Sequence, residues 1–339
     1  MNLHMKILFA VMLSLWSVGC FSQSTEAYDG AVTLTIENDA FTGSDNNYTN
    51  GIGISWVSDD LDTYSKDGFL NKWGRLWAFL PFISDNGYTT YASWSIVQEM
   101  ATPDDIDNPN PPEDDQPYAG ILYVDNLLYA KKERWAHAWE LKLGVVGPAS
   151  QAENVQKGFH ELIGSDEPRG WHTQLPNEPV INLGYTVAHL AAAGYAGGSA
   201  EWRIVPVATV GLGTYFTGAG LGIYGEVGWN LVDGFGGAAL RTGLNAASTV
   251  GVGPVQDWSI AFFGGLGGFG VARYLPLDGT VFRDSRSVDK KPFIGMASYG
   301  LSVRHRSFIL SFSATLFTKT FENERENDKF GTVSLSWYY

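Results

Sequence analysis

Apolar and polar residues alternate along most of the chain. This period of two predicts β-strands whose two faces meet different surroundings. The last residues, KFGTVSLSWYY, form one apolar face, made of Val333, Leu335, Trp337 and Tyr339. The opposite face consists of Ser334, Ser336 and Tyr338. The sequence therefore predicts a chain built mainly from strands.

About twelve stretches of this kind are present. They lie near residues 30–38, 48–58, 90–99, 119–130, 134–146, 179–190, 199–212, 218–230, 256–273, 292–305, 307–319 and 329–339. Each is about long enough for a tilted transmembrane strand, and Trp and Tyr gather toward many of the ends. The pattern predicts an all-β fold, a closed antiparallel transmembrane barrel of about 12 strands. The glycine-rich run AFFGGLGGFGVARY can form one bent strand or part of two, which leaves the count open by about two.

The N-terminus has the features of a secretory signal over residues 1–22. Lys6 precedes the short apolar core ILFAVMLSLWSVG, and small residues follow near Ser22. Such a core is too short to span a bilayer, so we expect cleavage and a single barrel domain over residues 23–339. The only cysteine, Cys20, would leave with the signal. An export signal together with an aromatic C-terminal residue favours a barrel of the bacterial outer membrane over a soluble sandwich.

Composition and charge narrow the classes of function. The chain carries a formal net charge of −14, which argues against nucleic acid as a partner. The acid-rich stretch DDIDNPNPPEDDQ, residues 104–116, spaces its carboxylates irregularly among prolines and fits no EF-hand pattern. We predict a loop near the lipid headgroups there, rather than a metal site.

Polar residues appear where the first strand should leave the membrane. The stretch AVTLTIENDAF puts Val32, Leu34 and Ile36 on one face, and the same parity puts Asn38 on this lipid-facing side. An amide in that position is costly unless a polar group covers it. We therefore assign a function to Asn38 and Asp39, whereas most polar residues of the following turn, TGSDNNYTNG, are typical turn formers.

One segment breaks the alternation. Residues 148–168, PASQAENVQKGFHELIGSDEP, place Val155, Phe159 and Leu162 on one face of a short amphipathic helix in an extracellular loop. Such a helix can lie against the outer wall and cover polar groups. RGWHTQLPNEP follows at residues 169–179, so the helix, His172 and the rim of the sixth strand are expected to be neighbours.

Three motifs in this order resemble those of the lipid A 3'-O-deacylase family of Gram-negative outer membranes. They are IENDAFTGSDNNYTNG, PYAG at residues 117–120, and GWHTQLPNEP. The resemblance covers most of the mature chain. It implies a twelve-stranded barrel with a calcium-dependent site between the wall and a loop helix. It also implies hydrolysis of the ester that holds the 3'-linked acyl (acyloxyacyl) group of lipopolysaccharide, with lipid A as substrate. We further expect outer-membrane lipids as surroundings and a monomeric protein.

The resemblance also assigns residues. The family's catalytic histidine falls on His172, its amide and carboxylate on Asn38 and Asp39, and its downstream glutamate on Glu178, while Thr49 to Gly51 would line the same site. The implied Ca²⁺ ligands are Asn38, Asp39 and Glu178, with backbone carbonyl groups. One departure is Gln116, which stands where the family usually has a basic residue; this weakens the case for a cationic substrate contact there.

The chemistry of these side chains agrees with the implied reaction. A neutral imidazole can take a proton from water, so His172 is the predicted general base. A hard cation prefers oxygen ligands and would stabilise the oxyanion. A serine–histidine mechanism has less support, because no G-x-S-x-G motif is present.

Other classes of protein remain open at this stage. An outer-membrane phospholipase would use the same ester chemistry, and a porin or a structural barrel would need no catalyst. Against a porin, many inward positions are Gly, Ala, Ser or Thr, which suit a narrow, filled barrel. His137 and His189, within strands, and His160, on the predicted helix, are expected to be packed or interfacial residues.

Overall fold

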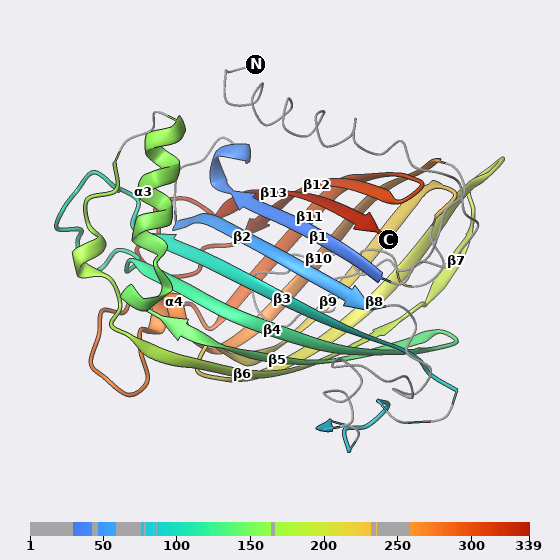
Figure 1. The fold of residues 1–339 in the computed structure, drawn as a ribbon, viewed down its shortest axis with the longest axis horizontal. Coiled ribbons are helices and arrows are strands. Elements are labelled where there is room, and N and C mark those ends of the chain that lie inside the picture. The colour runs from blue at the N-terminus through green and yellow to red at the C-terminus, as the bar shows by residue number, and fades with distance from the viewer. Residues whose placement is uncertain are drawn as a thin grey trace.

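Antiparallel strands make up most of the protein (Figure 1). The computed structural model describes residues 30–42, 47–58, 76–77, 79–83, 85, 87–163, 167–231, 235 and 258–339. The predicted signal, residues 1–22, lies outside this range. The strands are β1 (Gly30–Asn38), β2 (Asn47–Ser58), β3 (Thr89–Thr102), β4 (Ala119–Lys132), β5 (Trp135–Val146), β6 (Glu178–His189), β7 (Ala192–Tyr195), β8 (Ala200–Gly213), β9 (Phe216–Trp229), β10 (Trp258–Tyr274), β11 (Phe293–His305), β12 (Phe308–Phe317) and β13 (Lys329–Tyr338).

The strands close into a barrel because each of them except the short β7 pairs with a neighbour on both sides. β1 pairs with β2 and with β13, and β6 pairs with β5 and with β8. The short β7 lies along the same edge of β8, one step beyond β6, so β6 and β7 together form one wall strand. The barrel therefore has twelve wall strands, as predicted, and the glycine-rich run forms the single strand β10. Closure pairs both edges of the wall strands from β1 to β6 and from β8 to β13, as the hydrocarbon region of a bilayer requires.

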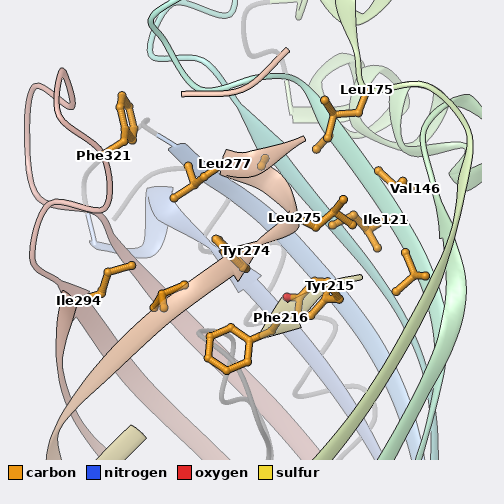
Figure 2. Packing of buried hydrophobic residues seen from close by; sticks show 14 of the residues in the cluster. Ile121, Val146, Leu175, Tyr215, Phe216, Tyr274, Leu275, Leu277, Ile294 and Phe321 are labelled. Carbon is orange, nitrogen blue, oxygen red and sulfur yellow. The ribbon is translucent and has the colours of Figure 1, made fainter. Parts of the chain in front are cut away.

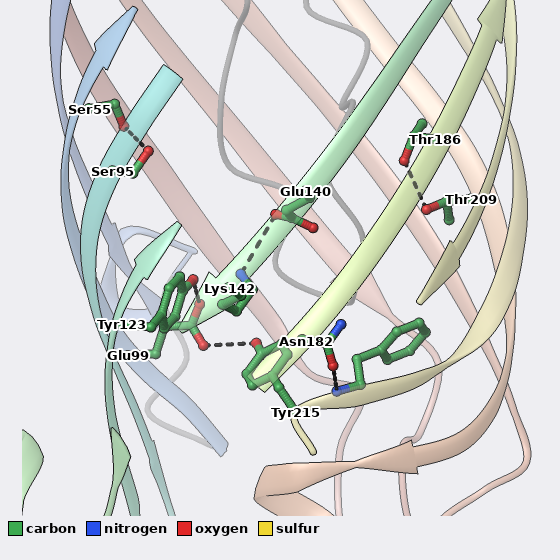
Figure 3. Close-up of polar contacts among 11 residues, drawn as sticks. Ser55, Ser95, Glu99, Tyr123, Glu140, Lys142, Asn182, Thr186, Thr209 and Tyr215 are labelled. Carbon is green, nitrogen blue, oxygen red and sulfur yellow. Dashed lines mark hydrogen bonds and ion pairs between the residues drawn. The ribbon is translucent and has the colours of Figure 1, made fainter. Parts of the chain in front are cut away.

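The two faces of each strand meet different surroundings. Leu34, Ile52 and Trp56 are exposed on the outside, as the alternation predicted. Hydroxyl side chains face inward and pair across strands, for example Ser55 with Ser95 at 2.9 Å between their Oγ atoms. Figure 3 shows this pair on the inner side of the wall. The apolar outer band needs no cover from protein because lipid surrounds it.

Charged side chains also line the interior, where the sequence suggested mainly small residues. Arg203 Nη2 lies 2.8 Å from Glu226 Oε1, and Lys142 Nζ lies 3.8 Å from Glu140 Oε1. The Lys142 ammonium also lies 3.9 Å from the centroid of the Tyr123 ring. Figure 3 shows the Glu140 and Lys142 pair inside the barrel. Pairing reduces the cost of burying these charges away from water.

An apolar cluster packs into the mouth at the end of the barrel opposite Gly30 and Tyr339 (Figure 2). The short helix α4 (Leu275–Asp278) contributes Leu275 and Leu277, which are buried. Burial raises the pKa of the Tyr215 hydroxyl, which stays protonated and donates a hydrogen bond of 2.8 Å to Glu99 Oε2. A mouth packed in this way does not fit the wide pore of a porin.

Histidines near the other end of the barrel are packed against aromatic rings. The ring centroids of His137 and Phe82 are 3.8 Å apart, and those of His189 and Trp135 are 4.3 Å apart. His137 Nδ1 lies 2.8 Å from the Tyr185 hydroxyl. The packed or interfacial positions predicted for both histidines are confirmed. In the part of the chain that the structure describes, no helix is long and apolar enough to cross a membrane.

Candidate active site

Four residues form a row across the outer wall at the mouth end of β1 to β4. Asn38 pairs with Asn50, Asn50 with Met100, and Met100 with Gly120. All four lie on the outward face, because the alternation places them with exposed apolar residues such as Val124. The prediction that Asn38 faces outward is therefore confirmed, and Asn50 lies beside it.

The PYAG motif, residues 117–120, packs against two neighbouring segments of the chain. Tyr118 is completely buried and donates a hydrogen bond of 3.2 Å to the carbonyl oxygen of Ile106. Burial raises the pKa of Tyr118 to about 12, so the hydroxyl remains a donor. A Cβ atom on Gly120 would lie 2.3 Å from the Ala152 Cβ and 2.4 Å from the Ser150 Oγ. Only glycine at position 120 allows the following helix to approach the wall this closely.

The predicted loop helix is α3 (Ala152–Ile163). It follows the 3-10 turn η3 (Pro148–Ser150), and the Ser150 hydroxyl accepts a hydrogen bond of 3.3 Å from the backbone N–H of Ala152. The Gln98 side chain of β3 donates to the carbonyl oxygen of Ser150 at 2.5 Å. Figure 1 shows α3 lying across the mouth ends of β3 and β4.

The helix turns its polar side to the wall and its apolar side outward. Gln156 and His160 are 1% and 7% exposed, whereas Val155 and Phe159 are 43% and 37% exposed. A helix on a water-soluble protein would bury its apolar face instead. This arrangement fits a helix with lipid on its outer side. It also agrees with the prediction that the helix covers polar groups of the wall. The side chain of Leu162 lies outside the described residues.

His172 lies next to this helix, in the 3-10 turn η4 (Trp171–Thr173). Trp171 is fully buried against Met100, Tyr118 and Ala152. Its indole Nε1 donates to Gln156 Oε1 at 2.7 Å, which ties the turn to α3. The His172 side chain is exposed. The predicted proximity of His172 and the helix is therefore confirmed through Trp171.

The chain then crosses from the outer wall into the mouth. Leu175 is buried in the apolar cluster of the mouth, and its N–H donates to the carbonyl oxygen of Tyr118 at 2.9 Å. Glu178 follows at the start of β6 and faces inward, on the same side as Val180. Its Oε1 and Oε2 accept hydrogen bonds of 2.6 and 2.7 Å from the backbone N–H groups of Val281 and Phe282.

The remaining predicted residues lie at the end of β1 and in β2. Asp39 is almost fully buried in the turn η1 (Asp39–Thr42), and the Thr42 hydroxyl donates to its carbonyl oxygen at 2.8 Å. Thr49 belongs to β2, but its side chain lies outside the described residues. Two strand spacings, roughly 10 Å, separate Asn38 from Met100, on which Trp171 packs.

The predicted calcium ligands are not gathered at one point. Asn38 and Asp39 are consecutive, whereas Glu178 lies on β6, five strands further around the wall. Among the described residues, no group of three or more histidine, cysteine or carboxylate side chains could hold a metal ion. The side-chain oxygens of Asn38, Asp39 and Asn50 are of the kind that Ca²⁺ prefers as ligands. The two carboxylate oxygens of Glu178 instead accept hydrogen bonds from Val281 and Phe282.

The acid-rich stretch 104–116 forms a loop, as predicted. It meets the loop between β12 and β13 through Asp104, whose Oδ2 lies 3.4 Å from Arg325 Nε. Burial raises the pKa of Asp104, of Asp115 and of Glu324 above the ordinary values for these carboxyl groups. The folded loops therefore bind protons more tightly than the unfolded chain does.

This difference predicts loops that are better protected in mild acid. The stabilisation is present at low pH and is lost as the pH rises through the raised pKa values. Amide hydrogen exchange in the loops that carry Asp104, Asp115 and Glu324, corrected for intrinsic rates, should be slower at about pH 4, near the ordinary carboxyl pKa, than at about pH 8. Asp104→Asn should reduce that dependence. Equal protection at both pH values would contradict the prediction.

Comparison with known proteins agrees with the architecture. The family model described as outer membrane protein LpxR matches residues 7–339. The solved structure of LpxR from Salmonella typhimurium has a TM-score of 0.70 and 17% sequence identity, covering 91% of this chain and 100% of that chain. The β-domain of the Bordetella autotransporter BrkA has a TM-score of 0.42 and 8% sequence identity, covering 93% of this chain and 100% of that chain. No curated protein sequence matches.

The family match extends over nearly the whole chain, and the twelve-stranded barrel with lipid-facing apolar residues agrees with it. Both findings place the protein in the bacterial outer membrane. The chain belongs to the LpxR family of outer membrane proteins.

Proposed function

We propose that this protein is a lipid A 3'-O-deacylase, an ester hydrolase whose site lies on the outer wall beneath α3. The observation that carries the proposal is the orientation of α3. Its inner side and the wall supply polar groups, its outer side is apolar and exposed, and an exposed histidine lies beside it. A lipid substrate can reach such a site sideways from the membrane, without passing through the packed mouth of the barrel.

In the proposed reaction, His172 acts as the general base. It removes a proton from water while the water oxygen attacks the carbonyl carbon of the 3'-linked ester. When the tetrahedral intermediate collapses, the bond between that carbon and the sugar oxygen breaks. The imidazolium then returns the proton to the sugar oxygen. The products are a free carboxylic acid and a 3'-hydroxyl group, and no covalent enzyme intermediate forms.

Asn38 and Asp39, with Asn50 beside them, are the residues we propose to hold Ca²⁺. Backbone carbonyl groups and water would complete the six to eight oxygen ligands that this ion prefers. When bound, the ion would stabilise negative charge on the ester oxygen. Thr49, next to Asn50 in β2, is proposed to line the same site. Glu178 is proposed to act on the segment that carries His172, because its carboxylate binds a neighbouring loop.

The function is tested with purified protein in liposomes that contain lipid A, followed by mass spectrometry of the lipid. We expect loss of the 3'-linked acyl group when Ca²⁺ is present and little loss when a chelator is added. Asp39→Asn should raise the Ca²⁺ concentration needed for half-maximal activity. Unchanged lipid A, from protein shown to be folded, would overturn the proposal.

A phospholipase is the second candidate, because an outer-wall site open to lipid could also receive a glycerophospholipid. The same liposomes decide between the two. Release of fatty acid from glycerophospholipid, with lipid A intact, would replace the deacylase by the phospholipase. Release from lipid A alone would exclude it.

A further inference from the structure

The loop between β10 and β11 touches the histidine-bearing segment at two places. Glu178 accepts hydrogen bonds from the N–H groups of Val281 and Phe282 in this loop. At the other place, Arg286 Nη1 donates to the Thr173 hydroxyl at 3.4 Å. Thr173 directly follows His172, so the two contacts hold the segment on the C-terminal side of the histidine.

Arg286 connects three loops. Besides Thr173, its Nη2 donates to the carbonyl oxygens of Pro111, at 3.3 Å, and of Pro112, both in the loop between β3 and β4. Among the described residues, no carboxylate lies within ion-pair distance of Arg286. The guanidinium therefore donates hydrogen bonds to neutral oxygen acceptors. Such bonds depend on the planar, forked arrangement of its N–H groups more than on its charge.

The loop that carries Arg286 is itself fastened to the barrel. Arg273 Nη2, on β10, donates to the carbonyl oxygen of Gly279 in the loop, and Lys290 Nζ, in the loop, donates to the carbonyl oxygen of Val271 on β10 at 2.8 Å. The N–H of Val288 donates to the carbonyl oxygen of Leu277, a residue buried in the mouth cluster. These hydrogen bonds fix the backbone of the loop that carries Arg286.

We propose that Arg286 and Glu178 are positioning residues that fix the turn carrying His172. This inference rests on the function proposed above. Trp171 and Leu175 anchor the backbone on either side, whereas the imidazole of His172 is exposed and makes no hydrogen bond or ring contact within the part of the chain that the structure describes. The Thr173 hydroxyl donates to the carbonyl oxygen of Gly170 at 2.8 Å and receives Arg286, so it sets the tilt of the turn. A displacement of about 1 Å can lower a rate by roughly a hundredfold.

The kinetic test uses Arg286→Gln, Arg286→Lys and Glu178→Gln in the liposome assay. Arg283→Gln is the matched control, because it removes an exposed arginine from the same loop. We expect kcat to fall roughly 10- to 100-fold in all three variants, with KM unchanged, and the control to behave as the wild type. A raised KM in Arg286→Gln that Arg286→Lys restores would show a charge contact to substrate and overturn the positioning role.

A second measurement does not depend on activity. Trypsin can cut after Arg169, whose N–H donates to the carbonyl oxygen of Ile106 at 2.9 Å next to the turn. We expect faster cleavage at this bond in Arg286→Gln and Glu178→Gln than in the wild type and Arg283→Gln. Equal cleavage in all four proteins would overturn the inference. A wild type that leaves lipid A intact would overturn the proposed function, and the cleavage rates would still decide whether the loop holds the segment.

Discussion

His172→Ala should lower lipid A deacylation by roughly a thousandfold, because a general base contributes about 10² to 10⁴ to a rate. The imidazole is exposed, so its removal leaves the packing of Trp171 and α3 intact. The measurement is the initial rate of 3'-acyl release, which mass spectrometry of the lipid determines. Folding is checked by the mobility shift of the unheated barrel in gel electrophoresis.

The control for this variant is His189→Ala, which removes a histidine stacked on Trp135 at the far end of the barrel. It should retain the wild-type rate. If His172→Ala also retained the wild-type rate in folded protein, another residue would have to remove the proton, and the proposed role of His172 would be wrong.

Gly120→Ala should have the next largest effect. The added Cβ would lie 2.3 Å from that of Ala152, so α3 must move away from the wall. We expect activity to fall roughly a hundredfold, because such a shift carries the turn of His172 with it through Trp171 and Gln156. The rate of 3'-acyl release and the exposure of α3 to proteolysis would both report the change.

Gly225→Ala is the matched control. Gly225 lies on β9, and a Cβ there would have its nearest neighbour at 3.8 Å, an ordinary contact. This variant should keep the wild-type rate. Normal activity in Gly120→Ala would contradict the proposal that the site depends on close contact between α3 and the wall.

The strands could be predicted from the sequence because lipid imposes a strict period of two on every wall strand. The direction of α3 could not be predicted in the same way. Its spacing defines an apolar and a polar face, but the outward position of Val155 and Phe159 depends on lipid outside and a polar wall inside. A helical period alone does not say which medium each face meets.

The position of a site residue could be predicted where the alternation along a strand decides which face of the wall its side chain lies on. The same parity places Glu178 with Val180 on the inner face, because Ile181 and Leu183 face lipid. That signal was present in the sequence and argued against grouping Glu178 with Asn38. The contribution of Arg286 had no such signal, because it comes from a loop more than a hundred residues away from Thr173.

The structural roles of Tyr118, Gln98 and Gln156 were also missed by sequence analysis. Tyr118 belongs to the PYAG motif, but the motif shows neither its burial nor its contact with Trp171, whose ring centroid lies 4.9 Å away. Gln98 donates to Ser150, and Gln156 accepts from Trp171. Both hydrogen bonds form only when α3 lies against the wall. Such contacts depend on packing between loops, which no local pattern encodes.

The outward apolar face of α3 also affects how the barrel sits in the membrane. Val155 and Phe159 extend the lipid-compatible surface on the side of β3 and β4, beyond what the strands themselves provide. On this side the hydrophobic surface therefore extends further toward the mouth than β3 and β4 alone would place it. A bilayer of uniform thickness can match such a surface if the barrel axis tilts or if the leaflet thickens locally. Either response would bring the lipid boundary to the level of α3, beside the proposed catalytic site.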